Sequence, residues 1–227
     1  MKKTLLFFAL PFLFFTQCKT LRVSDFHAKA PVNERLPRMG MQVHQESFAA
    51  AFDRETFAKG WNGNVAIPGS AGPNEYFALS DLPLEDVFSA FGNEVNENLV
   101  ENRGERYGNI RFKLLNYDRR APGWGYQLAS WATLNTLNVA GMPHNRYRSE
   151  LELQVEITDI NKKVIARYSA PGSGRAYVAM YYGYRPGDAW RKANLLALQD
   201  AMQVIRPKIE ADAGDLRKKL LETGSKK

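Results

Sequence analysis

Few side chains in this sequence could carry out covalent or metal chemistry. The chain has one cysteine, Cys18, and three histidines, His27, His44 and His144. None of these histidines has a histidine, cysteine or carboxylate at the spacing of a metal site, and the sequence contains no nucleophile elbow, Walker loop or HExxH motif. A pair of catalytic carboxylates is not excluded, because the two acids of a hydrolase need not be close in sequence. The pattern therefore favours binding over catalysis and predicts no cofactor.

The cysteine stands directly after an apolar leader. Two lysines precede an apolar run over residues 5–15, LLFFALPFLFF, and two polar residues connect this run to Cys18. A basic start followed by such a run is typical of a secretory signal. As a helix the run would reach about 16 Å at about 1.5 Å per residue, whereas the hydrocarbon core of a bilayer is about 30 Å thick. We therefore predict a cleaved signal peptide over residues 1–17 rather than a spanning helix.

The end of the leader, Phe15-Thr16-Gln17-Cys18, resembles a bacterial lipoprotein signal. Thr16 fits the usual motif, whereas Phe15 replaces the usual Leu and Gln17 replaces the usual Gly or Ala. The resemblance implies that Cys18 becomes the new amino terminus and carries several fatty-acid chains, which anchor a protein stably where one chain does not. The alternative is a plain signal peptide with a chance cysteine. Lys19 is compatible with sorting to the outer membrane, because in some bacteria Asp at this position retains the protein.

The composition is that of a globular domain with a modest positive charge. The chain has 227 residues, of which 44% are hydrophobic, and a formal charge of +7. Loss of the two leader lysines from 31 basic residues leaves 29 against 24 acidic ones, or +5. This balance suits an anionic membrane surface or an acidic polymer. The charge is too small and too dispersed to predict nucleic acid as a partner.

Alternation of apolar and polar residues predicts an antiparallel sheet. The pattern is strictest over residues 150–158, where the apolar set should face the core and Glu150, Glu152, Gln154 and Glu156 should face water. The predicted strands are 108–118, 147–159, 163–170 and 174–184, with a shorter first strand within 36–44. Turns are expected at 159–162 and 171–174. Gly172-x-Gly174 is not read as a phosphate loop, because a strand rather than a helix follows it.

Two helices are predicted, over 82–102 and 188–206. In the first, Glu94, Glu97 and Glu101 are expected to form a solvated acidic face. The second should kink or break at Pro207. The fold class is therefore α+β, an antiparallel sheet with helices packed on one face. This domain should span residues 36–222, after a lipidated cysteine and tether over 18–35 and before a flexible tail over 223–227.

The stretch from 121 to 145 contains no Asp, Glu, Lys or Arg. Its large apolar and aromatic side chains are Trp124, Tyr126, Leu128, Trp131, Leu134, Leu137, Val139 and Met142. We expect a buried element of the core, because aromatic side chains dominate ordinary cores. The other interpretation is a segment that docks on a membrane interface or a partner. The candidate docking surface then consists of Trp124, Tyr126 and Trp131, together with Tyr181 and Tyr182.

The order of elements after the cysteine loosely resembles small α+β envelope lipoproteins, such as curli-pore and penicillin-binding-protein-activator proteins. This resemblance rests on element order alone and implies little about function beyond a place in the cell envelope. We expect a non-enzymatic envelope lipoprotein that binds or scaffolds an envelope protein or cell-wall polymer. The alternative is an envelope hydrolase acting on cell-wall material, which a cleft with two close acids of perturbed pKa would favour.

Overall fold

The computed structural model describes residues 34–44, 47, 85–120, 124–179, 183–184 and 186–225. Within them a four-stranded mixed sheet is combined with helices, which is the predicted α+β class. The leader, Cys18 and the tether up to residue 33 lie outside the described residues. So do Tyr181 and Tyr182 of the candidate docking surface, and the predicted cleavage and anchoring of the chain stay predictions.

The sheet has the strand order β1-β2-β3-β4. The strands are β1 Gly40–Val43, β2 Gly108–Arg120, β3 Asn145–Asp159 and β4 Val164–Val178. β2, β3 and β4 pair antiparallel as predicted, but β1 pairs parallel with β2, so the sheet is not purely antiparallel. A parallel pair needs a crossover connection. The chain between β1 and β2, which includes a helix, makes that crossover.

The predicted break between the strands 163–170 and 174–184 is wrong, because one strand, β4, runs continuously from Val164 to Val178. The expected turn at 171–174 lies in the middle of this strand, where Gly172 pairs with Leu151 and Gly174 with Ser149. Both glycines are explained by packing: an added Cβ on either one would collide with a backbone oxygen of the helix below. Pro171 is tolerated because β4 is an edge strand.

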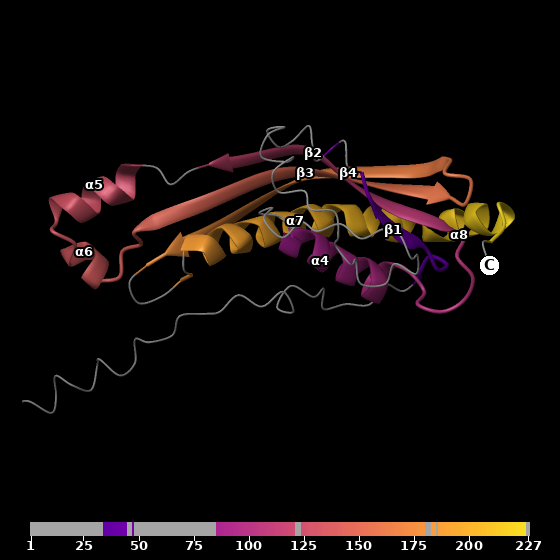
Figure 1. The fold of residues 1–227 in the computed structure, drawn as a ribbon, viewed down its shortest axis with the longest axis horizontal. Coiled ribbons are helices and arrows are strands. Elements are labelled where there is room, and N and C mark those ends of the chain that lie inside the picture. The colour runs from indigo at the N-terminus through magenta and orange to yellow at the C-terminus, as the bar shows by residue number, and fades with distance from the viewer. Residues whose placement is uncertain are drawn as a thin grey trace, which may run out of the picture.

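Helices cover one face of the sheet, as predicted. They are α4 Glu85–Glu94, which continues as the π-helical turn η3 Val95–Leu99, and α7 Pro186–Ala211, followed by α8 Ala213–Glu222. The rings of Phe88 and Phe91 on α4 lie 5.6 and 4.6 Å from the ring of Phe112 on β2. α7 packs along β3 and β4 on the same face (Figure 1).

The structure corrects two details of these helices. α7 does not break at Pro207, and the chain breaks instead at Asp212, whose carboxylate accepts a 2.7 Å hydrogen bond from the Tyr168 hydroxyl. Pro207 and Gln203 both lie on the exposed side of α7, where water can bond the carbonyl that proline leaves unpaired. Glu94 is buried rather than solvated, and it accepts a 2.8 Å hydrogen bond from Asn98.

The core lies between the sheet and these helices. Leu151, Leu153, Val155 and Ile157 are all buried there, which confirms the predicted facing of β3. Glu150 and Glu152 lie on the opposite, open face as predicted. Glu156 shares that open face but is only 1% exposed, so its predicted contact with water is wrong. Its burial accompanies ion pairs with three cationic side chains from β2 and β4.

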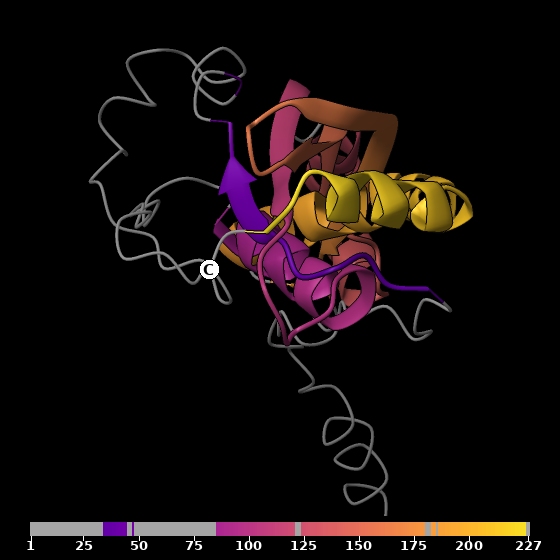
Figure 2. The same cartoon turned by 90° about the vertical axis from the view of Figure 1, so that its right-hand side faces the viewer.

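The molecule is elongated along its strands. Two further helices, α5 Trp124–Ala132 and α6 Thr136–Val139, connect β2 to β3. They lie beyond one end of the sheet, and α8 lies at the other end (Figure 1). Figure 2 views the molecule along this long axis, with α8 and the turn between β3 and β4 nearest the viewer.

The outer edge of β4 is closed at three places. Pro171 has no N–H to offer. The backbone N–H of Ser173 donates a 2.9 Å hydrogen bond to the carboxylate of Asp200 on α7. Farther along, the N–H of Tyr184 donates to the Tyr177 carbonyl at 3.1 Å. These three features interrupt the row of unpaired backbone groups by which an edge strand otherwise recruits another strand.

Candidate functional site

The connection between β2 and β3 forms a helical tip, which we define as residues 124–142. The N–H of Asn135 donates to the Ser130 carbonyl at 2.7 Å and turns the chain from α5 into α6. α6 ends where the N–H of Met142 donates to the Leu137 carbonyl at 2.8 Å. Gly141 lies between them with φ 105°, the left-handed conformation that glycine adopts most readily at a helix end. The tip is therefore closed by its own backbone hydrogen bonds.

The apolar side chains of the tip face solvent. Trp131 is 81% exposed and Leu134 is 86% exposed. Leu128, Leu137 and Val139 are exposed as well. The expectation that this stretch is a core element is therefore wrong for these side chains. The physical reason is position, since the tip lies past the end of the sheet, where none of the other described helices covers it (Figure 1).

Leu134 combines exposure with an unfavourable backbone. It has φ 47° and the next residue, Asn135, has φ 64°. Asn adopts this left-handed region readily, but a leucine there costs about 1–2 kcal/mol. A residue that is both strained and exposed gains nothing from burial to offset that cost. Such a residue is more readily explained by contact with something outside the chain.

The base of the tip carries a row of arginines on the open face of the sheet. In the strand register Arg120 lies opposite Arg148, and Arg148 lies opposite Arg175. Arg146, one step nearer the tip on the same face of β3, pairs with Tyr177. Like charges at directly opposite positions destabilise a sheet. Arg148 is partly compensated by an ion pair with Glu150.

The candidate docking surface is brought together only in part. Tyr126 and Trp131 both lie on α5, Tyr126 partly buried and Trp131 exposed. Trp124 begins α5, and its side chain lies outside the described atoms, as do Tyr181 and Tyr182 entirely. Leu134, Leu137 and Val139 were not among the predicted site residues, although the uncharged stretch contains them. The arginine row was not predicted from the sequence either. The feature that could have indicated it is the presence of arginines directly before and directly after the uncharged stretch.

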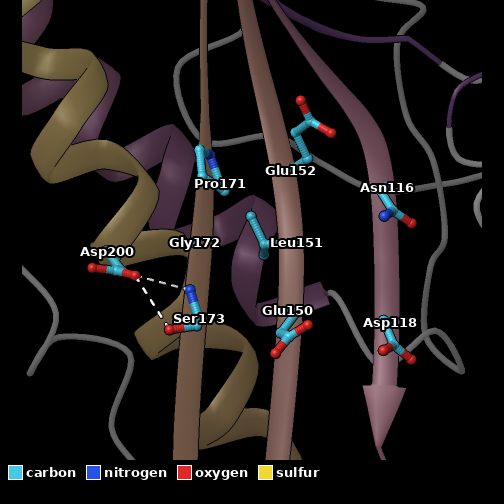
Figure 3. A pocket seen from close by; sticks show the side chains of 9 residues that line it. All are labelled: Asn116, Asp118, Glu150, Leu151, Glu152, Pro171, Gly172, Ser173 and Asp200. Carbon is cyan, nitrogen blue, oxygen red and sulfur yellow. Dashed lines mark hydrogen bonds between the residues drawn. The ribbon is translucent and has the colours of Figure 1, made fainter.

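A second candidate region is an acidic pocket of about 440 Å³ on the open face. It is lined by Asn116, Asp118, Glu150, Leu151, Glu152, Pro171, Gly172, Ser173 and Asp200. Figure 3 shows Asp118 and Glu150 side by side on neighbouring strands, and Asp200 reaching from α7 to Ser173. Glu150 pairs with Arg148, and Asp200 closes the edge of β4, so both of these carboxylates have structural partners. The pocket is the place where a carboxylate pair could act.

Neither a metal cluster nor a spanning helix occurs in the part of the chain that the structure describes. No group of three or more His, Cys, Asp or Glu side chains there is arranged to hold a metal ion. Among the same residues, no helix combines the length and the apolar content needed to cross a bilayer. His44 and His144 lie far apart in the fold, the first after β1 and the second before β3.

Comparison with known proteins supplies no family for this chain. No protein-family model matches the sequence, and no curated protein matches it as a relative.

Proposed function

We propose that this chain is a lipid-anchored protein of the cell envelope that acts by binding another envelope component rather than by catalysis. The observation that carries the proposal is the helical tip, a segment without charged side chains in which Trp131, Leu134 and three further apolar side chains are exposed. Monomeric soluble proteins rarely expose contiguous apolar patches larger than roughly a few hundred Å², and such patches mark interaction sites. An exposed tryptophan and leucine at the projecting end of a domain are placed to make such a contact.

The anchor is proposed from the leader. Cys18 follows an apolar run of lipoprotein type, and acylation would explain a single cysteine in an exported chain. Lipid on Cys18 would hold the domain at a membrane, and Lys19 suits the outer membrane in bacteria that sort by this position. The partner is then a component within reach of that membrane, such as an envelope protein, a cell-wall polymer or the lipid surface itself.

Fatty-acid labelling in the producing cell tests the anchor. Cys18→Ala should abolish incorporation of labelled palmitate and leave a longer, unprocessed precursor. Thr20→Ala, two residues farther along, is the matched control and should be labelled and processed like the wild type. Labelling that persists in Cys18→Ala would show that the chain is not a lipoprotein of this type.

The acidic pocket favours one alternative, an envelope hydrolase acting on cell-wall material. Its expected signature is release of soluble fragments from purified cell wall by the wild-type chain. Asp118→Asn or Glu150→Gln should then abolish release, whereas Trp131→Ala should not. If the wild type releases nothing under conditions where it stays folded, the binding role is favoured over this alternative.

A further inference from the structure

We infer that the helical tip inserts into the interface of an anionic lipid bilayer, with the arginines at its base against the headgroups. This inference rests on the proposed binding function and names the occupant of the tip. It requires a second contact with the membrane, separate from any lipid on Cys18. Three features of the described residues support it: the distribution of apolar side chains, the absence of charge within the tip, and the position of the arginines.

Exposed apolar side chains come from every part of the tip: both of its helices and the turn between them. Leu128 and Trp131 belong to α5, Leu134 to the turn, and Leu137 and Val139 to α6, and all five are exposed. The tip also projects beyond the sheet (Figure 1). When a projecting segment exposes apolar side chains from several elements, a surrounding apolar phase can cover all of them at once. The interfacial region of a bilayer is such a medium, and tryptophan is enriched there.

Positively charged side chains lie next to the tip in the sequence but not within it, a distribution that suits binding to an anionic surface. From residue 119 to residue 149 the chain carries four arginines, Arg119, Arg120, Arg146 and Arg148, and no Asp or Glu. All four lie at the base of the tip, and none lies within it. Insertion of the tip would therefore bury no charged side chain. The same movement would bring the exposed Arg146, and Arg175 on the neighbouring strand, toward the headgroups of an anionic leaflet, which attract basic residues. Arg119 is not part of this contact, because its guanidinium stacks on the ring of Trp190 on α7.

The arginine row also favours lipid over a second copy of this chain. Within the described part of the molecule, the exposed Arg146 and Arg175 form no ion pair. A symmetric dimer built on the tip would present the same patch from both copies. Its two arginine rows would then approach one another at the rim of the interface. An anionic lipid surface instead neutralises the like charges of Arg148 and Arg175, which lie opposite one another on β3 and β4.

The test places a reporter at the end of the tip in the full, lipid-anchored chain. Leu134→Cys introduces a thiol for an environment-sensitive dye, because Cys18 is the one cysteine of the sequence and acylation would block it. The labelled protein is reconstituted into vesicles of phosphatidylcholine alone, or of phosphatidylcholine mixed with phosphatidylglycerol. We expect a blue-shifted emission with phosphatidylglycerol that brominated lipid quenches, and a much smaller change without it.

Matched variants separate insertion from general proximity to the membrane. The same dye on Asn161→Cys, in the turn between β3 and β4 at the opposite end of the sheet, should report water with either lipid. Arg146→Glu and Arg175→Glu should each lower the inserted fraction of the Leu134→Cys reporter by at least about fivefold. Lys218→Glu, an equal charge reversal on α8 at the far end, should leave it unchanged.

Several outcomes would overturn the inference. One is a reporter at residue 134 that stays in water with anionic lipid, and another is a shift that the arginine reversals leave unchanged. A shift that appears without vesicles and grows with protein concentration would assign the tip to a second copy. A shift that needs added membrane protein would assign it to a protein partner.

Failure of the anchor is measured separately, by the mass of the amino-terminal peptide. If that peptide carries no lipid, the reporter is measured in a Cys18→Ala background, with the protein added to the same vesicles from solution. The dependence on phosphatidylglycerol is still expected there, so loss of the anchor and loss of insertion give different results.

Discussion

Glu156 lies on the open face of the sheet among three cationic side chains. Its carboxylate accepts 2.9 Å hydrogen bonds from Lys113 Nζ and from Arg167 Nε, and a guanidinium nitrogen of Arg111 lies 3.6 Å away. Burial acts to raise the pKa of Glu156, but the hydrogen bonds from Lys113 and Arg167 together outweigh it. The pKa therefore lies below its ordinary value of 4.5. The carboxylate joins β2, β3 and β4 on the face opposite the described helices α4 and α7.

We expect Glu156→Gln to lower the free energy of unfolding at neutral pH by about 2 kcal/mol, the scale of a hydrogen bond to a charged group. A carboxyl whose pKa is lower in the folded state stabilises the fold above its unfolded pKa and loses that contribution as pH falls through the folded value. Urea unfolding at neutral and increasingly acidic pH should therefore show the difference shrinking below about pH 4.5. Glu152→Gln, at an exposed position on the same strand, is the control and should change the free energy of unfolding little. A loss of stability in Glu156→Gln that does not depend on pH would contradict the proposed link between the pKa of Glu156 and stability.

Trp131 gives a second prediction at the residue scale. Because its ring is 81% exposed, Trp131→Ala should change the free energy of unfolding by less than about 0.5 kcal/mol. Phe112→Ala is the matched control in the core and should cost about 3–5 kcal/mol. Thermal melts of the two variants in the same full chain compare these effects. A drop for Trp131→Ala as large as that for Phe112→Ala would mean that the tryptophan is buried.

At the scale of elements, the contact between β4 and α7 depends on two glycines and a run of alanines. Gly172 and Gly174 lie against Ala197 and Ala193, close enough that a methyl group would meet the helix backbone. The alternation of residue types correctly predicted the strands on either side of this contact. The prediction from sequence is wrong at the contact itself, where it places a turn. A Pro-Gly-Ser-Gly sequence usually marks a turn, but here the glycines allow a close approach of helix and strand.

Gly174→Ala should therefore destabilise the domain by about 1–3 kcal/mol, the usual cost of overpacking a close contact. The obstacle is backbone rather than a movable side chain, so α7 must shift as a unit. Ser169→Ala on the exposed side of the same strand is the control and should be near neutral. Chemical denaturation measures both variants. Equal stability of Gly174→Ala and the wild type would mean that α7 is not packed directly on β4.

The tip shows where inference from residue pattern ends. Its lack of charge was visible in the sequence, and so was the choice between core and docking surface. Periodicity records which residues of an element share a face, but not whether another element lies opposite that face. The sequence pattern therefore does not determine whether another element packs against Trp131. The predicted burial of Trp131 is wrong because the connection from β2 to β3 extends beyond the sheet and its helices.

At the scale of the whole molecule, the tip and the layered domain should be separable. β2 and β3 are paired up to Arg120 and Arg148, so their ends lie side by side and a short turn can join them. Replacing residues 124–142 by a short Gly-Ser linker should leave the cooperative thermal transition in place, with only a small change in midpoint. The binding to anionic vesicles proposed above should be lost. A replaced chain that no longer folds would show that the tip is part of the core structure.

The closed edge of β4 bears on the membrane anchoring proposed for this chain. Molecules tethered to one membrane diffuse in two dimensions and share an orientation, so each meets its neighbours at a high effective concentration. Under those conditions an open fifteen-residue strand would invite neighbours to add strand by strand. Pro171, the carboxylate of Asp200 and the backbone of Tyr184 each remove a position where such growth could start. Copies anchored as proposed could therefore reach a high density on a membrane without associating into a fibre through the edges of their sheets.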